Sequence, residues 1–443
     1  MKHLLALLLL VMTACTGARD YNIMDYGAVS DTTRLSTEAL QRAIDECSRQ
    51  GGGRVVVPAG SFKIGSVILR SNVQLHLEQG ATLFGSTDLR DYRRMKSSYV
   101  SLRTQTETIQ LIYADSVENV VIDGFGTIDG RGSAFEKLSW NDEGITRPHL
   151  LRFIQSRDVT VKDVTLRNSG CWMQHYLACD RLKIEDIKVF NRNNYNNDAL
   201  DLDGCHDVIV QGMLADSDDD GITLKSTSPR LCEDIRISDC IVSSHCNAIK
   251  LGTESNGGYR NISISGIVVK PSADQSSRFF GNDRGTSVIS LEVVDGGVLD
   301  NVTVSNVVAE GTEAPFFVRL GNRARGYKDG QVIDHVGTLR NVVISDVVVS
   351  DAGSVGSSIT GLPGHPVEGI TLRNIRIEHR GGQKATAIPA DEKEKDYPEA
   401  TMWGVLPAQG FFVRHARNVT FQNVEIHAVA ADERPEYVLV DAK

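Results

Sequence analysis

Carboxylate side chains gather twice near the middle of this chain of 443 residues. Asp198 ends the run Asn196-Asn197-Asp198, and Asp219 and Asp220 follow one internal repeat later. Units of a repeat fold stack on one another, so residues about one period apart in sequence become neighbours in space. Crowded carboxylates raise one another's pKa, and one of them then stays protonated near neutral pH. The spacing therefore predicts acid and base chemistry on a sugar.

A short strand pattern recurs down the chain and must position these carboxylates. Each copy alternates β-branched apolar residues with polar ones, which indicates strands with one buried face. An Asn, Asp or Gly stands at a fixed place in the copies, where a sharp bend needs left-handed backbone geometry. Copies begin at residues 118, 157, 180, 206, 233, 260, 300, 340, 368 and 417.

The period of this pattern predicts the fold. Between residues 157 and 260 the steps run from 23 to 27 residues, and later steps near 40 indicate inserted loops. Short strands, bends and this period fit an all-β fold, the right-handed parallel β-helix; leucine-rich repeats and propellers have other spacings. Residues 36–49 carry an apolar stripe at helical spacing and predict a short helix that caps the N-terminal end. We expect residues 20–443 to form one such domain.

A second strand in each turn predicts which side chains point outward together. The aligned segments begin at Ala199, Gly221, Ala248, Val288 and Phe317. In this alignment one outward column contains Asp201, Thr223, Lys250, Ser290 and Arg319. Neighbouring coils lie about 4.8 Å apart. The sequence therefore predicts a polar groove, with the carboxylates at one level and two cations further along it. Asp201 either is solvated or pairs with Lys225 or Lys250.

At these residues the chain resembles the polygalacturonase-like pectin hydrolases of glycoside hydrolase family 28, over essentially its whole mature length. That family carries an Asn-Thr-Asp motif, an Asp-Asp pair, Gly-His-Gly and Arg-Ile-Lys. Asn196 to Asp198 match the first motif with one substitution, and Asp219-Asp220 match the second. The resemblance implies a pectin-lyase-like solenoid in which Asp219 is the general acid. It also implies that Asp198 and Asp220 hold and deprotonate the attacking water, in an inverting mechanism.

The later family motifs depart from the pattern. Strand phase puts Asn247 where the family has its His, and His245 precedes it by two residues, so either side chain could serve. Arg319 matches the family Arg, the Lys is missing, and Lys250 could supply that cation. Arg319 and Lys250 either bind a substrate carboxylate or balance the charge of the acidic cluster.

Two further residues complete the predicted substrate-binding set. Asn196 belongs to the first acidic motif, and Trp172 is a candidate platform on which a sugar could stack. Ordinary packing is the alternative for Trp172, as it is for Trp403 and Tyr259.

Composition restricts the partners of this protein. A net charge of −10 argues against binding nucleic acid or an anionic membrane surface. No motif suggests a nucleotide, haem or metal cofactor, so we expect none. The cysteines after residue 15 are odd in number and lack CxxC spacing, which favours small packing residues over disulfides or zinc ligands. We expect a monomer whose partner is a pectic oligosaccharide or polysaccharide.

Residues 1–15 are predicted to be a signal peptide. Lys2 precedes an apolar stretch too short to span a bilayer, and the stretch ends in Met12-Thr13-Ala14-Cys15. This ending resembles a bacterial lipoprotein box, which would make Cys15 the lipidated residue. The sequence thus predicts a secreted lipoprotein of a Gram-negative bacterium, periplasmic or on the outer membrane, that meets the membrane only through its lipid.

These observations favour a glycoside hydrolase that cleaves a bond next to a uronic acid in homogalacturonan- or rhamnogalacturonan-derived chains. Insertions around 256–283, 322–337 and 378–410 could close one end of the groove, which favours exo over endo action. One alternative is a Ca²⁺-dependent pectate-lyase-like enzyme that uses the same carboxylates as metal ligands and Lys250 as base. A glycan-binding solenoid without catalytic activity is the other.

Overall fold

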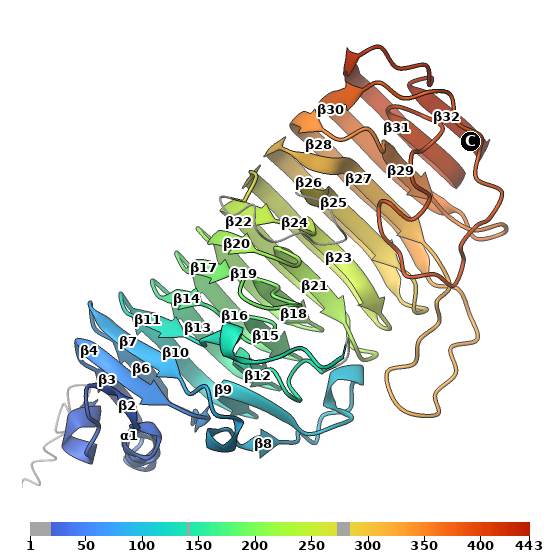
Figure 1. Ribbon diagram of the computed structural model, residues 1–443. Coiled ribbons are helices and arrows are strands. Elements are labelled where there is room, and N and C mark those ends of the chain that lie inside the picture. Colours follow the sequence, from blue (N-terminus) through green and yellow to red (C-terminus); the bar gives the residue numbers. More distant parts are fainter. Residues whose placement is uncertain (1–18, 140–141, 273–283) are drawn as a thin grey trace, which may run out of the picture.

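The computed structural model describes residues 19–139, 142–272 and 284–443. These residues form a right-handed parallel β-helix, whose coils stack from the N-terminal to the C-terminal end (Figure 1). The predicted fold is confirmed. The signal peptide and Cys15 lie outside the described residues and stay a prediction. Within the described residues, no helix has both the length and the apolar character needed to span a membrane.

Each coil contributes strands to three faces, and the predicted repeat forms the first of them. Its strands are β1 (Asp20–Asn22), β3 (Gly53–Val57), β6 (Val73–Leu77), β10 (Glu118–Gly124), β13 (Arg157–Lys162), β16 (Asp180–Glu185) and β19 (His206–Gln211). From here on, longer strands continue round the bend into the second face: β22 (Cys232–Ser244), β24 (Gly258–Val269), β26 (Val298–Glu310), β28 (Thr338–Ala352), β30 (Val367–Gly381) and β31 (Phe411–Ala430).

In the N-terminal coils the second face consists of short strands, and in the later coils the second halves of the long strands take their place. The short strands are β2 (Asp31–Leu35), β4 (Gly60–Ile64), β7 (Ala81–Gly85), β11 (Thr127–Asp129), β14 (Thr165–Arg167), β17 (Lys188–Asn191) and β20 (Leu214–Ser217).

The third face carries the strands that follow the acidic motifs. They are β5 (Val67–Ile68), β9 (Thr108–Asp115), β12 (His149–Ile154), β15 (Gln174–Leu177), β18 (Leu200–Asp203), β21 (Ile222–Ser226), β23 (Asn247–Ser255), β25 (Gly285–Val293), β27 (Thr312–Leu320), β29 (Ser357–Thr360) and β32 (Tyr437–Ala442), with the start of β31 between the last two. The short β8 (Arg94–Met95) pairs antiparallel with β9.

Helices are few among the described residues. α1 (Thr37–Arg49) lies against the N-terminal end of the solenoid, and Figure 1 shows it beside the first coils. Its predicted apolar stripe is fully buried: Leu40, Ala43, Ile44 and Cys47. The capping helix is therefore confirmed. Short 3₁₀ helices are η1 (Ile23–Tyr26), η2 (Leu89–Asp91), η3 (Leu102–Thr104) and η4 (Gly132–Ala134).

Left-handed residues make the bends, as the pattern predicted. The second residue of the repeat has a positive φ in coil after coil, for example 56° at Asn119, 56° at Asp207 and 59° at Asn301. Asn and Asp tolerate this conformation because their short polar side chains can form local hydrogen bonds. The repeat therefore specifies where each coil turns.

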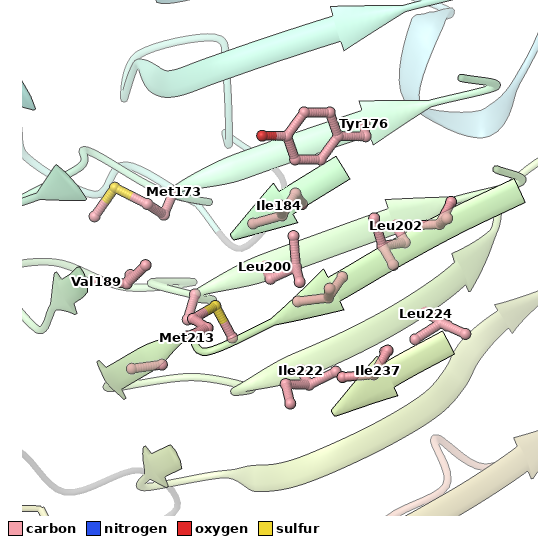
Figure 2. Packing of buried hydrophobic residues seen from close by; sticks show 14 of the residues in the cluster. Met173, Tyr176, Ile184, Val189, Leu200, Leu202, Met213, Ile222, Leu224 and Ile237 are labelled. Atoms are coloured by element: carbon pink, nitrogen blue, oxygen red, sulfur yellow. The ribbon is translucent and has the colours of Figure 1, made fainter. Parts of the chain in front are cut away.

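The apolar half of the alternation fills the inside of the coils. Figure 2 shows Leu200 and Leu202 of β18 above Ile222 and Leu224 of β21, with residues of other faces around them. All four are fully buried, and each buried side chain of this size stabilises the fold by about 1.5–3 kcal/mol. The residues between them necessarily point to the outside of the third face.

The register of the third face confirms most of the predicted outward column. Asp201 pairs with Thr223, Thr223 with Lys250, and Lys250 with Ser290. The predicted place of Arg319 in this column is wrong, because Ser290 pairs with Phe317 and Arg319 lies two residues further on. A slip of two residues leaves every side chain on the same side of the strand, so the alternation cannot distinguish the two registers.

Acidic and basic residues alternate along the outside of the first face. The first residue of each repeat pairs in register with the first of the next: Glu118, Arg157, Asp180, His206, Glu233, Arg260, Asp300, Arg340, Glu368 and Arg417. We call this row the charge ladder. Ion pairs join neighbours within it, such as Arg340 Nη2 and Asp300 Oδ2 at 2.9 Å.

Most cysteines of the described residues belong to the hydrophobic core, whereas Cys171 and Cys246 do not, and Cys246 Sγ lies within 4.8 Å of carboxylate oxygens of Asp219 and Asp220. Cys47, Cys171, Cys179, Cys205, Cys232, Cys240 and Cys246 are all buried and unpaired. The interpretation as packing residues is confirmed for most of them, but not for Cys171 and Cys246.

Candidate active site

A cavity of about 420 Å³ lies over the third face, beside β18, β21 and β23. Pockets for small ligands commonly span about 300–1,000 Å³, so this one suits a short stretch of a sugar chain. The coils contribute Asp198, Asp219, Asp220, Lys225, Lys250 and Glu254 to its walls, together with Trp172, Asn196 and Thr253. Segments between the coils contribute Arg103, Glu143, Arg325 and Tyr397.

Stacking of the coils brings the three predicted catalytic carboxylates to this cavity. Asp198 precedes β18 and Asp220 precedes β21 by the same offset, and Asp219 is the residue before Asp220. The backbone couples the two turns, since the Ala199 amide donates to the Asp220 carbonyl at 3.0 Å. Carboxylate oxygens of Asp219 and Asp220 approach within 4.8 Å of each other. The predicted vertical registry is therefore present.

Asp219 is placed to hold a proton. Burial raises the pKa of its carboxyl well above the ordinary value, and the neighbouring Asp198 and Asp220 add to the effect. Ser244 Oγ and Ser217 Oγ donate to the Asp219 carbonyl at 2.6 Å and 3.0 Å, which fixes the backbone of the turn. Asp219 lines the cavity, where a general acid must lie to reach its substrate.

Asp220, the next residue, is held ionised. Burial would raise its pKa, but Lys250, Lys225 and a hydrogen bond from Asn247 outweigh burial, and the pKa lies below the ordinary value. Lys250 Nζ is 3.0 Å from Asp220 Oδ2, and Asn247 Nδ2 donates to Oδ1 at 2.8 Å. Adjacent carboxyls thus have pKa values moved in opposite directions, which separates an acid from a base.

Asp198 lies between these extremes. Burial raises its pKa to about 6 against the opposing charge of Lys225, whose Nζ is 3.5 Å from Asp198 Oδ2. The same Nζ is 3.3 Å from Asp201 Oδ1, so Asp201 pairs with Lys225, one of the partners that the sequence suggested. Burial and the charge of Asp198 raise the pKa of Asp201 well above its ordinary value. Of the two carboxyls that share Lys225, Asp198 therefore ionises before Asp201.

The geometry distinguishes the two candidates for the family His position. Asn247 contacts the catalytic pair through Asp220, and Ser287 Oγ donates to Asn247 Oδ1 at 2.6 Å, which orients the amide. His245 instead bonds Asp218, with Nδ1 3.0 Å from Oδ1, and neither His245 nor Asn247 lines the cavity itself. Asn247 thus fills the position that strand phase gave it.

Asn196 and Trp172 both line the cavity, as predicted for substrate-binding residues. Asn196 Oδ1 accepts a hydrogen bond of 2.9 Å from the fully buried Arg147, which fixes the acidic turn. The Trp172 ring is covered by cations, with the Arg103 guanidinium 4.6 Å and the Lys225 Nζ 4.7 Å from its centroid. Its exposed fraction is 3%, so the ring positions the cations and offers little open face to a sugar.

The predicted cation Arg319 lies elsewhere. It is fully buried, and its Nη2 donates to the carbonyl of Glu392 at 2.6 Å, beside the ring of Trp403. Arg319 thus anchors the segment 382–410, whose Tyr397 lines the cavity. Lys250 does line the cavity, but it serves as the ion-pair partner of Asp220. Tyr259, the other aromatic candidate, is buried in the core.

Sequence reasoning missed the residues that the segments between coils bring to the cavity. Arg103, Glu143, Arg325 and Tyr397 come from segments outside the repeat, where no periodicity fixes a position. Glu254 lies on β23, four residues after Lys250, and strand phase alone could have placed it on the outer face.

Comparison with known proteins shows which family the chain belongs to. The sequence profile described as "Glycosyl hydrolases family 28" matches residues 47–394, more than half of the chain. The chain belongs to glycosyl hydrolase family 28. The family resemblance is therefore confirmed, and the protein is a glycoside hydrolase.

Relatives within family 28 are distant. A probable polygalacturonase of Vitis vinifera is 26% identical over 393 residues, which are 84% of this chain and 76% of that protein. An exo-poly-alpha-D-galacturonosidase of Dickeya chrysanthemi is 28% identical over 250 residues, 45% of this chain and 41% of that protein. The crystal structure of a hyperthermoactive exopolygalacturonase from Thermotoga maritima shares the fold, with a TM-score of 0.71, 21% identity and 92% coverage of both chains.

Proposed function

We propose that this family 28 enzyme hydrolyses glycosidic bonds of galacturonic-acid-containing pectic chains, from the chain end and with inversion. The observation that carries the proposal is the pair of neighbouring carboxyls whose pKa values move apart, raised in Asp219 and lowered in Asp220, at one cavity. Relatives with polygalacturonase names support the pectic substrate.

The chemistry follows from the protonation states. Asp219 gives its proton to the oxygen that leaves with the departing sugar as the glycosidic bond breaks. Asp220 and Asp198 accept a proton from a water molecule, whose oxygen bonds to the anomeric carbon from the opposite side. Exchange with solvent then returns a proton to Asp219 and removes one from the base. Attack from the side opposite the leaving group inverts the configuration.

The walls of the cavity support attack at a chain end. Tyr397 and Arg325 come from segments that the sequence analysis expected to restrict the groove, and Arg103 and Glu143 come from two others. A cavity of about 420 Å³ with walls from four such segments suits the end of a chain better than its middle. The name of the Dickeya chrysanthemi relative agrees with exo action.

A panel of defined homogalacturonan and rhamnogalacturonan oligosaccharides tests the proposal. Mass spectrometry should show one short product from the first minutes, whereas endo action gives a mixture of lengths. Proton NMR during the first turnover should show the anomer opposite to that of the substrate. Product absorbance near 235 nm, together with loss of activity in chelator, would instead show a lyase.

The ion pairs of the site argue against the calcium-dependent alternative. Lys250 lies 3.0 Å from Asp220, and Lys225 lies 3.5 Å from Asp198. A Ca²⁺ ion would have to bind beside these two ammonium groups. The charges of the carboxylates are already balanced by the chain itself.

A further inference from the structure

Two arginines at the cavity are separate from the catalytic ion pairs. Arg103 and Arg325 both donate to the same oxygen, Glu254 Oε1, from Nη2 atoms at 2.7 Å and 2.8 Å. Lys225 and Lys250, by contrast, lie beside the catalytic carboxylates. The arginines are therefore cations whose purpose the acid and base chemistry does not explain.

Glu254 places the arginine pair close to the reacting bond. Lys225 Nζ lies 3.5 Å from Asp198 Oδ2 and 3.9 Å from Glu254 Oε2, so one ammonium group spans the gap between the two carboxylates. All of these side chains line the same cavity. A sugar that sits next to the scissile bond on this side lies against the two guanidinium groups.

The arginines come from unrelated segments, and each segment is held in place. The Leu102 amide donates to the Thr227 carbonyl at 2.8 Å, and Arg152 Nη2 donates to the Arg103 carbonyl at 2.6 Å. On the other side, the Arg325 amide donates to Asp295 Oδ1 at 3.0 Å. Both guanidinium groups therefore start from a fixed backbone, which lowers the entropy lost when they bind an anion.

Charge in this corner of the cavity favours an anionic ligand. The carboxylate of Glu254 has a pKa well below the ordinary value, because Arg103, Lys225 and Arg325 outweigh the effect of burial. The two arginines thus share this one carboxylate, whereas Lys225 is also paired with Asp198 and Asp201. The side chains of Arg103 and Arg325 are 24% and 38% exposed, against 6% for Glu254, and both line the cavity, although their Nε atoms are buried.

We propose that Arg103 and Arg325 bind the carboxylate of a uronic acid residue next to the cleaved bond and so select an acidic sugar at that position. The proposal rests on the proposed function. A guanidinium group presents a planar fork of donors that matches a carboxylate, and two such groups can grip it from both sides. Glu254 holds the two like charges together until the substrate carboxylate arrives.

Arg325→Gln tests this selection with two substrates. One is a galacturonate trisaccharide, and the other is the same trisaccharide with its carboxylates reduced to primary alcohols. On the acidic trisaccharide the variant should raise KM about 10- to 100-fold with kcat changed less than threefold, as expected for a lost charge-assisted contact. On the reduced trisaccharide, wild type and variant should have the same KM.

Two further variants are controls that distinguish a lost substrate contact from a loss of folding. Arg325→Lys keeps the charge and loses the fork, and its KM on the acidic trisaccharide should lie between the other two. Arg340→Gln removes an arginine of the charge ladder and should match wild type on both substrates. Equal KM increases on both substrates, or an unchanged KM on the acidic one, would overturn the proposal.

A binding measurement separates this proposal from the proposed function. Titration calorimetry with the Asp219→Asn protein needs no hydrolysis, and it should show tighter binding of the acidic trisaccharide than of the reduced one. Adding Arg325→Gln should abolish that difference. If wild type cleaves none of the pectic oligosaccharides while this difference in binding is found, the proposed function is wrong and the carboxylate site stands. If wild type cleaves them but the Asp219→Asn protein binds both trisaccharides equally, the proposed function stands and the carboxylate site is wrong.

Discussion

The outer surfaces of the first and third faces have the same pattern of sequence and opposite electrostatic behaviour. On the first face, Asp300 pairs with the half-exposed Arg340. Partial burial of Asp300 would raise the pKa of its carboxyl, but hydrogen bonding from Arg340 outweighs burial and lowers that pKa. On the third face, Asp219 faces other carboxylates under the loops, and burial raises its pKa well above the ordinary value. A side chain that points away from the core of a β-helix is therefore not always exposed to solvent. The segments that cover one face and leave the other open turn ordinary aspartates into an acid and a base.

The strongest contrast between the faces should appear in the rate. Asp219→Asn removes the proton donor and should lower kcat by about 10²- to 10⁴-fold. Asp300→Asn changes an aspartate of the charge ladder and should leave kcat unchanged. Initial rates on a pectic oligosaccharide, with circular dichroism to confirm folding, provide the measurement. Comparable losses in the two variants would remove the distinction between the faces.

Removing the cation from an ion pair should also affect the faces differently. Lys250→Met leaves Asp220 buried without its main counter-charge, which raises the pKa of Asp220 and should destabilise the protein by about 3–5 kcal/mol. Arg340→Met, on the charge ladder, should leave the unfolding midpoint nearly unchanged. Urea unfolding of both variants, followed by tryptophan fluorescence, measures the difference. Equal decreases in the urea midpoints of Lys250→Met and Arg340→Met would contradict this difference between the faces.

Most of the fold and the position of the carboxylates could be predicted from the sequence, because both depend on local rules. Alternation fixes which face a side chain joins, and a period near 25 residues fixes which coil it joins. Arg319 shows where these rules end, since a slip of two residues satisfies alternation equally well. Arg103 and Arg325 show a second limit, because they lie in segments that belong to no repeat. Their positions depend on tertiary contacts that no periodic pattern encodes.

The pH dependence of kcat/KM should reflect the carboxyls buried at the third face and not those of the charge ladder. Asp198, with a pKa raised to about 6, must be ionised to help accept the proton of water, so kcat/KM should fall as the pH drops through about 6. Lys225→Met removes the charge that opposes this rise, so the acidic limb should move to higher pH. Rates from pH 4 to pH 9 measure both profiles. An unmoved limb would show that Lys225 does not act on Asp198.

A smaller effect is expected in stability, from a buried carboxyl of β25. Burial raises the pKa of Glu292 from the ordinary value of 4.5 to about 8, so the stability that Glu292 contributes is present below about pH 4.5 and is lost as the pH rises to about 8. Glu292→Gln should flatten this part of the stability profile and raise the unfolding temperature at pH 8 by a few degrees. The control is Glu425→Gln, at an exposed position paired with Arg376. Parallel profiles for Glu292→Gln and wild type would contradict the assignment.

The charge ladder also restricts how such a protein can grow or shrink during evolution. Acidic and basic residues alternate from coil to coil, so loss of the coil that begins at Arg260 would place Glu233 against Asp300, two like charges. Loss of two coils would place Glu233 against Arg340 and restore an attractive pair. Duplications and deletions of coils in even numbers therefore preserve the matching of neighbours, and odd numbers break it.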